Sequence, residues 1–220
     1  MKSNTEKINI IIIGGSKLSQ EIIESVDFAE QYHIVGVIAL DKVKPQPVYT
    51  SNYPMYHGMS AFYELQQKHH ITHGIVDLQD LNLKKDCIKD IQRSCKGFQF
   101  INLLHPSVVL GKNVQLGSGN IIGAKVIMNS DSTLGDFCWI NNRVSIGHDS
   151  TIEPYVTIDT NATIGGNTRI GKGSYIGMSA NIVNDITIAK HCHIEANTLV
   201  LRSVPANTKM RGIPATVVPS

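Results

Sequence analysis

The second half of the chain carries an aliphatic residue or Met at every sixth position, without a single insertion. Residues at this spacing that match the pattern are Leu110, Leu116, Ile122, Met128, Leu134, Ile140, Ile146, Ile152, Ile158, Ile164, Ile170, Ile176, Ile182, Ile188, Ile194 and Val200. Gly often follows this residue, and a small or β-branched residue usually stands two positions before it. Such fixed similarity is typical of a β-helix, in which each coil packs on its neighbours.

Three hexapeptides make one triangular coil of about 18 residues, so residues 110–200 predict about five coils. The aliphatic side chains are expected to point inward and to stack from coil to coil. Gly and small polar residues are expected to turn the corners, because Gly adopts backbone conformations that other residues avoid.

Residues 7–104 have a different pattern, in which apolar strand-like runs alternate with helical spacing. The pattern predicts strands at 8–13, 33–40, 73–78 and 98–104, helices near 18–29, 59–70 and 82–95, and a proline-rich loop at 45–54. This order favours a small, open, parallel α/β sheet. The change of pattern at His105 divides the chain into domains 1–104 and 105–220.

In open parallel sheets, ligands bind beyond the carboxyl ends of the strands. Two segments follow strand ends and are candidates for ligand binding: Gly14-Gly15-Ser16 after the first strand and Asp41-Lys42 after the second. The glycine turn leads into a helix, whose free N–H groups can meet a phosphate. It lacks the G-x-G-x-x-G spacing of a dinucleotide site, and a tight strand–helix turn explains it equally.

Composition narrows the possible functions. The 20 basic and 18 acidic residues give a formal net charge of +2, and no basic stripe points to nucleic-acid binding. The four cysteines are scattered and form no CxxC pair, which favours reduced thiols in a cytoplasmic protein. The first apolar run, 8–13, is too short for a membrane span, so none is expected. No trio of His, Asp or Glu has metal-ligand spacing, and no metal is expected.

One histidine occupies a special place in the repeat. His148 follows the inward Ile146 and Gly147 at a corner, and Asp149 comes directly after it. One coil later, 18 positions on, stands Gly166. Stacked coils are about 5 Å apart, so the imidazole is expected next to a backbone without a side chain. An ordinary exposed histidine on the coil surface remains the alternative.

The hexapeptide pattern resembles that of the left-handed β-helix acyltransferases. Within that group, an open α/β first domain followed by "LLHPS" and then the coils is similar to the NeuD/PglD-type sugar acetyltransferases. The resemblance implies a Rossmann-like first domain, a left-handed parallel β-helix and a homotrimer. It also implies acetyl transfer from acetyl-CoA to the amino group of a nucleotide-linked amino-sugar, in cytoplasmic synthesis of surface glycans such as lipopolysaccharide.

Several residues match the family's functional positions. His148-Asp149 matches a His-acid pair, which implies that His148 is the general base and that Asp149 orients its ring, while the Gly166 N–H stabilises the oxyanion. Asn141 matches an Asn near the acceptor amine. The family's second histidine is Thr157 here, so one acetyl-CoA contact is lost or replaced. Further acetyl-CoA contacts are implied at Met178, Ala196, Gly212 and Pro214.

The first domain departs further from the family. The family's Gly-Gly-His is Gly14-Gly15-Ser16 here, and its Gly-Asp-Asn-like loop is Asp77-Leu78-Gln79-Asp80. Gly14, Gly15, Ser16, Asp41, Lys42 and Asp77 are therefore candidate contacts to a nucleotide sugar whose identity stays open. A 4-amino-4,6-dideoxyhexose carried by UDP or dTDP is favoured. Sugar O-acetylation and a non-catalytic, sugar-binding β-helix are the alternatives.

Overall fold

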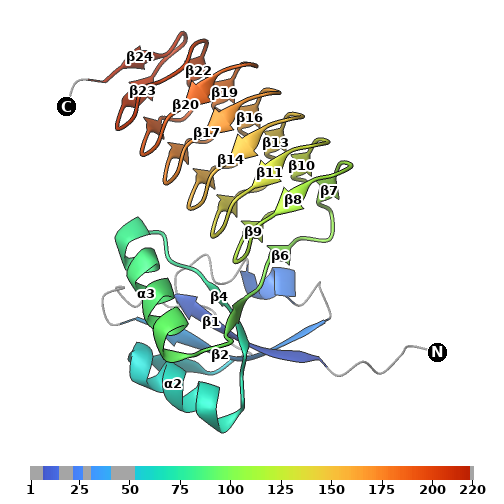
Figure 1. The fold of residues 1–220 in the computed structure, drawn as a ribbon, viewed down its shortest axis with the longest axis vertical. Coiled ribbons are helices and arrows are strands. Elements are labelled where there is room, and N and C mark those ends of the chain that lie inside the picture. Colours follow the sequence, from blue (N-terminus) through green and yellow to red (C-terminus); the bar gives the residue numbers. More distant parts are fainter. Residues whose placement is uncertain (1–6, 15–21, 27–30, 41–52, 219–220) are drawn as a thin grey trace. The chain divides into compact units, whose positions relative to one another are not determined.

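The computed structural model describes residues 7–14, 22–26, 31–40 and 53–218, and it divides the chain into two compact units, Met1–Leu103 and Leu104–Ser220. Figure 1 shows the fold and labels many of the helices and strands. No helix within the described ranges is long and apolar enough to cross a membrane.

The first unit contains a five-stranded parallel sheet in the order β3-β2-β1-β4-β5. Its strands are β1 (Ile8–Gly14), β2 (Tyr32–Ala39), β3 (Met55–His57), β4 (His73–Val76) and β5 (Gln99–Phe100). Ile10 to Ile13 of β1 are fully buried, as a central parallel strand requires. The chain order reverses between β1 and β4, so their carboxyl ends flank the place where open α/β sheets bind ligands. The predicted open parallel sheet is confirmed, but β3, only three residues long, was not predicted.

Two complete helices accompany the sheet, α2 (Gly58–Lys68) and α3 (Leu81–Ser94), and residues 22–26 are also helical. Asp80 caps α3 by accepting a hydrogen bond from the Leu83 N–H at 2.8 Å. Each helix buries one apolar face: Phe62 and Leu65 in α2, and Cys87, Ile88 and Ile91 in α3.

The predicted single strand 98–104 is wrong, because the run is divided between two sheets. Residues 99–100 form β5 beside β4, whereas β6 (Leu103–Leu104) is the first strand of a β-helix sheet and pairs with β9. An unbroken apolar run satisfies either sheet equally, so the sequence pattern does not reveal the change of partner.

The second unit is a parallel β-helix with three sheets. The six-stranded sheet contains β7 (Val109–Leu110), β10 (Ile127–Met128), β13 (Ser145–Ile146), β16 (Thr163–Ile164), β19 (Asn181–Ile182) and β22 (Leu199–Val200). The five-stranded sheet contains β8 (Gln115–Leu116), β11 (Thr133–Leu134), β14 (Thr151–Ile152), β17 (Arg169–Ile170) and β20 (Thr187–Ile188). The eight-stranded sheet contains β6, β9 (Ile121–Ile122), β12 (Trp139–Ile140), β15 (Thr157–Ile158), β18 (Tyr175–Ile176), β21 (His193–Ile194), β23 (Lys209–Arg211) and β24 (Thr216–Val217).

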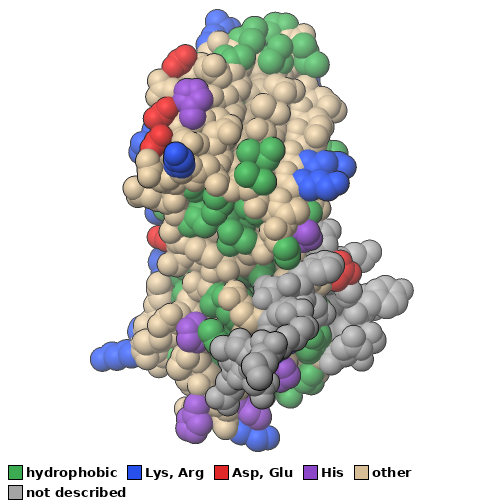
Figure 2. Space-filling view, turned by 90° about the vertical axis from the view of Figure 1, so that its right-hand side faces the viewer, with side chains coloured by type: hydrophobic (Ala, Val, Ile, Leu, Met, Phe, Trp, Pro, Cys, Tyr) green, Lys and Arg blue, Asp and Glu red, His purple; other side chains and the backbone are tan. Residues whose placement is uncertain are grey.

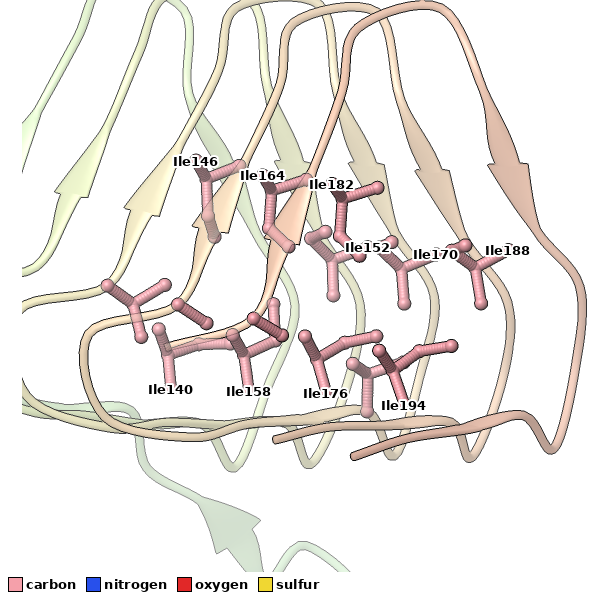
Figure 3. Packing of buried hydrophobic residues seen from close by; sticks show 14 of the residues in the cluster. Ile140, Ile146, Ile152, Ile158, Ile164, Ile170, Ile176, Ile182, Ile188 and Ile194 are labelled. Carbon is pink, nitrogen blue, oxygen red and sulfur yellow. The ribbon is translucent and has the colours of Figure 1, made fainter. Parts of the chain in front are cut away.

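The core of the β-helix is built from the residues at the six-residue spacing. Each strand pairs with the strand 18 residues on, so that Ile140 lies beside Ile158 and Ile158 beside Ile176. Figure 3 shows the resulting rows of isoleucine side chains inside the coils. Small buried residues such as Cys138, Ala162 and Cys192 complete the same cluster. The predicted inward set is confirmed except at its first members, since Leu110 is 40% exposed and Leu116 only half-buried.

The corners are often turned by small polar residues, as predicted, but not by the Gly that follows the inward residue. In each corner from Asn113 to Asn197 the third residue has a positive φ of 52–72°, and this position is often Asn or Asp. The Gly that follows the inward residue does not have a positive φ; it is needed because the next coil leaves no room for a side chain. A Cβ on Gly147, for example, would lie 2.6 Å from the Gly166 Cα.

The surface displays both charged and large apolar side chains. On the face drawn in Figure 2, the coloured Lys and Arg side chains lie scattered among uncharged ones and form no continuous stripe. Across the described residues, several large apolar side chains are also exposed, among them Val109 at 56% and Ile127 at 43% on neighbouring strands.

The stacked core generates a stability prediction. Ile158→Ala removes a fully buried side chain from between Ile140 and Ile176 and should lower the free energy of unfolding by about 2–5 kcal/mol. Ile213→Ala, at a position 73% exposed, should change it by less than about 0.5 kcal/mol. Urea unfolding followed by circular dichroism measures both, and equal effects would contradict the stacked-core description.

Candidate active site

His148 and Asp149 form a hydrogen-bonded pair at the corner between β13 and β14. His148 Nδ1 lies 2.7 Å from Asp149 Oδ2, and the two side chains are 66% and 60% exposed. An ionised carboxylate only accepts hydrogen bonds, so Nδ1 carries the proton and donates it. In the neutral ring this bond leaves Nε2 as the nitrogen that can accept a proton.

Gly166 provides the space that the imidazole occupies. The pairing of Ile146 with Ile164 sets the coil register, and His148 follows two residues after the first and Gly166 two residues after the second. A Cβ on Gly166 would lie 2.7 Å from Nε2 of His148 and 2.9 Å from Cε1. Any residue other than Gly would therefore push the ring away from its position over the next coil.

The N–H of Gly166 already has an acceptor. It donates to Asn184 Oδ1, one coil further on, at 3.0 Å. The same type of bond joins the Ser118 N–H to Asp136 and the Ala124 N–H to Asn142, so it is a regular feature of the corners. An oxyanion at this N–H would have to replace the Asn184 carbonyl.

The Asp149 side chain bonds to a different partner from the side chains at equivalent corner positions. Residues 18 positions apart stack on one another in columns from coil to coil. In the column that contains Asp149, Asn113 bonds to Asp131 and Asn167 bonds to Asp185 through their side chains, at 2.9 and 2.8 Å. Asp149 shares their positive φ, but its carboxylate bonds to the adjacent His148 instead. The corner conformation explains an Asp at this position; it does not explain the bond to the imidazole.

Asn141 lies at the corner before β13, and its amide is held on both sides. Its Oδ1 accepts from Trp139 Nε1 at 2.8 Å, and its Nδ2 donates to Asp159 Oδ1 at 2.8 Å. Asp159 also accepts from the Tyr175 hydroxyl at 2.8 Å. Trp139, Asp159 and Tyr175 are not among the site residues predicted from the sequence, although the 18-residue spacing of Asn141 and Asp159 points to their contact.

The residues implied for acetyl-CoA lie on the later coils. Thr157 lies between Trp139 and Tyr175 on the eight-stranded sheet, and exposed Met178 is one coil before exposed Ala196. Gly212 accepts from the Leu199 N–H at 3.0 Å through its carbonyl. Pro214 lines a pocket of about 290 Å³ together with Val200, Leu201, Arg202, Met210, Ala215 and Thr216.

In the first unit, Gly14 and Asp77 come together where β1 and β4 end. The Asp77 N–H donates to the Ile13 carbonyl at 2.6 Å, and a Cβ on Gly14 would overlap the Asp77 backbone. Gly14 is thus required by strand packing. The Asp77 side chain is fully buried, so its carboxylate lies beneath the surface of this edge. Gly15, Ser16, Asp41 and Lys42 lie outside the described residues.

The described cysteines do not resemble nucleophiles. Cys138 and Cys192 point into the β-helix core and are 0% and 2% exposed. Burial raises the pKa of Cys192 and raises that of Cys87 to about 12, which keeps these thiols protonated at neutral pH. Within the described residues, no three His, Cys, Asp or Glu side chains are grouped to hold a metal ion.

Comparison with known proteins identifies the repeat. Residues 131–166 and 167–202 each match the family model "Bacterial transferase hexapeptide (six repeats)". A search of curated protein sequences gives no match.

Solved structures share the whole architecture. A mutant of perosamine N-acetyltransferase from Caulobacter crescentus, in complex with CoA and GDP-perosamine, superposes with a TM-score of 0.87 at 23% identity and covers 96% of this chain and 97% of its own. The acetyltransferase domain of PglB from Neisseria gonorrhoeae, in complex with acetyl coenzyme A, gives 0.84 at 20% identity, covering 97% and 100%. WeeI from Acinetobacter baumannii gives 0.82 at 22% identity, covering 96% and 100%. The predicted fold, a Rossmann-like domain followed by a left-handed β-helix, is confirmed.

The His148–Asp149 bond generates a prediction about the imidazole tautomer. At a pH where the ring is neutral, His148 should carry its proton on Nδ1, because Asp149 accepts it there. Nitrogen-15 NMR of the histidine rings measures this directly, and Asp149→Ala should weaken the preference. The exposed corner residue His191 provides an internal reference. A proton found on Nε2 in the intact protein would contradict the described geometry.

Proposed function

We propose that the protein is an acetyl-CoA-dependent N-acetyltransferase that modifies the amino group of a nucleotide-linked amino-sugar. The observation that carries the proposal is the His148 imidazole, held by Asp149 at Nδ1, with Nε2 over the bare backbone of Gly166. The structures that share the fold include enzymes bound to CoA, acetyl coenzyme A and GDP-perosamine, which supports the same class of substrates here. A UDP- or dTDP-linked 4-amino-4,6-dideoxyhexose in cytoplasmic synthesis of surface glycans remains the favoured acceptor and setting.

The proposed chemistry is direct transfer. The sugar amine attacks the thioester carbonyl of acetyl-CoA and forms a C–N bond, while Nε2 of His148 takes a proton from the nitrogen. When the tetrahedral intermediate collapses, the C–S bond breaks and the CoA sulfur leaves as a thiolate, which takes the proton from the imidazolium. Asp149 keeps the ring oriented and stabilises its charged form at 2.7 Å. The buried cysteines support direct transfer over an acyl-enzyme.

Binding of the two substrates is assigned to different parts of the chain. The exposed Met178 and Ala196, and the pocket beside Pro214 with Arg202 at its wall, fit the arm and the anionic end of acetyl-CoA. Thr157 offers a hydroxyl in place of the family's imidazole. In the first unit, the switch point at Gly14 and Asp77 is the proposed nucleotide-sugar edge. Gly15, Ser16, Asp41 and Lys42 are proposed to contribute there.

We propose a homotrimer as the active assembly. Val109 and Ile127 expose apolar surface on neighbouring strands of one flat sheet, and packing such sheets about a threefold axis would cover it.

The central prediction concerns His148. With acetyl-CoA and a panel of GDP-, UDP- and dTDP-linked 4-amino-4,6-dideoxyhexoses, His148→Ala should lower kcat by about 10²–10⁴-fold, because the amine loses its general base. Thiol release with a colorimetric reagent measures turnover, and circular dichroism checks the fold. His191→Ala, at another exposed corner, is the matched control and should keep wild-type kcat. Near wild-type turnover by His148→Ala would refute the general-base role. No CoA release from the wild-type protein with any acceptor, the corresponding sugars with a hydroxyl included, would favour a non-catalytic β-helix.

A second prediction tests the proposed oxyanion donor. If the thioester oxygen replaces the Asn184 carbonyl at the Gly166 N–H, Asn184→Ala removes a competitor and should raise kcat/KM for acetyl-CoA about fivefold. The same change should lower the stability by about 1 kcal/mol. Asp136→Ala removes the equivalent acceptor of the Ser118 N–H and should affect stability only. An unchanged or lower kcat/KM in Asn184→Ala would assign the Gly166 N–H a purely structural role.

A further inference from the structure

A chain of side-chain hydrogen bonds crosses three successive coils at the corner that precedes β13. Trp139 Nε1 donates to Asn141 Oδ1, Asn141 Nδ2 donates to Asp159 Oδ1, and the Tyr175 hydroxyl donates to Asp159 Oδ2, each at 2.8 Å. The Thr160 N–H adds a fourth bond, to Asp159 Oδ1, at 2.7 Å. Asp159 thus receives three donors and lies at the centre of the network.

The network is set in a partly apolar environment. Trp139 is only 6% exposed, and Asn141, Asp159 and Tyr175 are half-buried. Burial, followed by the bond to Asp159, raises the pKa of Tyr175 to about 12, so its hydroxyl remains a donor across the working range of pH. Hydrogen bonds in such surroundings are costly to leave unmade, which favours one arrangement of the whole network.

Trp139 and Asp159, which contact the Asn141 amide from opposite sides, determine its orientation. An indole N–H only donates, and an ionised carboxylate only accepts. With the amide reversed, Trp139 Nε1 would face an NH₂ group and Asp159 would face an oxygen, so both contacts would become repulsive. Asn141 Oδ1 must therefore point to Trp139 and Nδ2 to Asp159.

This arrangement leaves one amide hydrogen of Asn141 outside the network. Nδ2 carries two hydrogens, and the bond to Asp159 uses one of them. The corner of Asn141 and the corner of His148 lie at the two ends of the same strand, β13. A donor in a fixed direction at this place is suited to an oxygen of the acceptor sugar or of the nucleotide attached to it.

We infer that Asp159 is a positioning residue, which together with Trp139 turns the Asn141 amide so that its second N–H faces the acceptor substrate. The inference rests on the proposed acetyltransferase function. Asp159 does not touch the reacting atoms; it acts through Asn141 and should affect acceptor binding rather than proton transfer at His148.

The test uses the full-length protein and two independent readouts. In Asp159→Ala the Asn141 NH₂ loses its acceptor, so the Asn141 amide is held by Trp139 alone and should lose its fixed direction. The KM for GDP-perosamine, or for whichever UDP- or dTDP-linked 4-amino-4,6-dideoxyhexose turns over, should rise about tenfold. The KM for acetyl-CoA and the pH profile of kcat should stay unchanged.

The second readout is the indole N–H signal in an amide NMR spectrum. Trp139 is the single tryptophan of the chain, so its indole signal needs no further assignment. In Asp159→Ala the bond from the indole N–H to the loosened Asn141 amide should weaken, so the indole signal should shift and exchange faster with solvent. This readout does not require an active enzyme.

Exchanging Asn141 and Asp159 tests whether the hydrogen-bond network alone is sufficient, or whether the N–H donor at position 141 is also required. In the double variant Asn141→Asp with Asp159→Asn, the carboxylate at 141 accepts from both Trp139 and the new amide, and the amide oxygen at 159 accepts from Tyr175. The indole signal should remain protected, but no donor at 141 faces the acceptor, so its KM should stay raised. Asp136→Asn, which alters a cross-coil carboxylate at another corner, should change neither readout.

The outcomes are distinct. An unchanged indole signal together with an unchanged acceptor KM in Asp159→Ala would overturn the inference. A lower kcat with a shifted pH profile and an unchanged acceptor KM would overturn it too, because Asp159 would then act through His148. If the wild-type protein acetylates no acceptor of the panel, the proposed function fails, and an unperturbed indole signal in Asp159→Ala would also remove the positioning role.

Discussion

The rest of the structure depends on the hydrogen-bonded register between one coil of the β-helix and the next. Each two-residue strand is too short to be stable alone, so its stability comes from the parallel partners 18 residues before and after it. The register stacks isoleucine on isoleucine within the core, and a shift by one residue would turn every inward side chain outward. The absence of insertions between residues 110 and 200 is the sequence counterpart of this requirement.

The same register converts sequence spacing into side-chain contact on the outside of the coils. His148, Gly166 and Asn184 follow one another at 18-residue steps, and each contacts the next: the imidazole over Gly166, and the Gly166 N–H on Asn184. Asn141 and Asp159 are joined in the same way at the neighbouring corner. The chemistry of each position is therefore decided by the residues one coil away, and a single Gly in a column makes room for the imidazole.

The sequence was sufficient for the parts of the structure that obey a period. The inward residues, the neighbourhood of His148 and Gly166 and the parallel sheet of the first unit follow from spacing and apolar pattern alone. The sequence was insufficient where one pattern is compatible with two different structures. The run 98–104 serves two sheets, and Gly147 provides close approach rather than a turn. Which partner a polar side chain chooses, such as Asn184 for the Gly166 N–H, depends on rotamers and distances that the pattern does not contain. The roles assigned to the site residues stay predictions.

The column arrangement also bears on how such a protein can change in length. Because every coil repeats the same register, adding or removing one whole coil beyond Val200 would leave the contacts of His148, Gly166 and Asn184 as they are. The loss of a coil between residues 148 and 184 would instead bring a different residue over the imidazole. A change beyond Val200 would keep the order of the three coils that carry His148, Gly166 and Asn184, but it would move or remove the proposed acetyl-CoA pocket beside Pro214. Chain length is therefore separable from the contacts of the imidazole, but not from the proposed binding of acetyl-CoA.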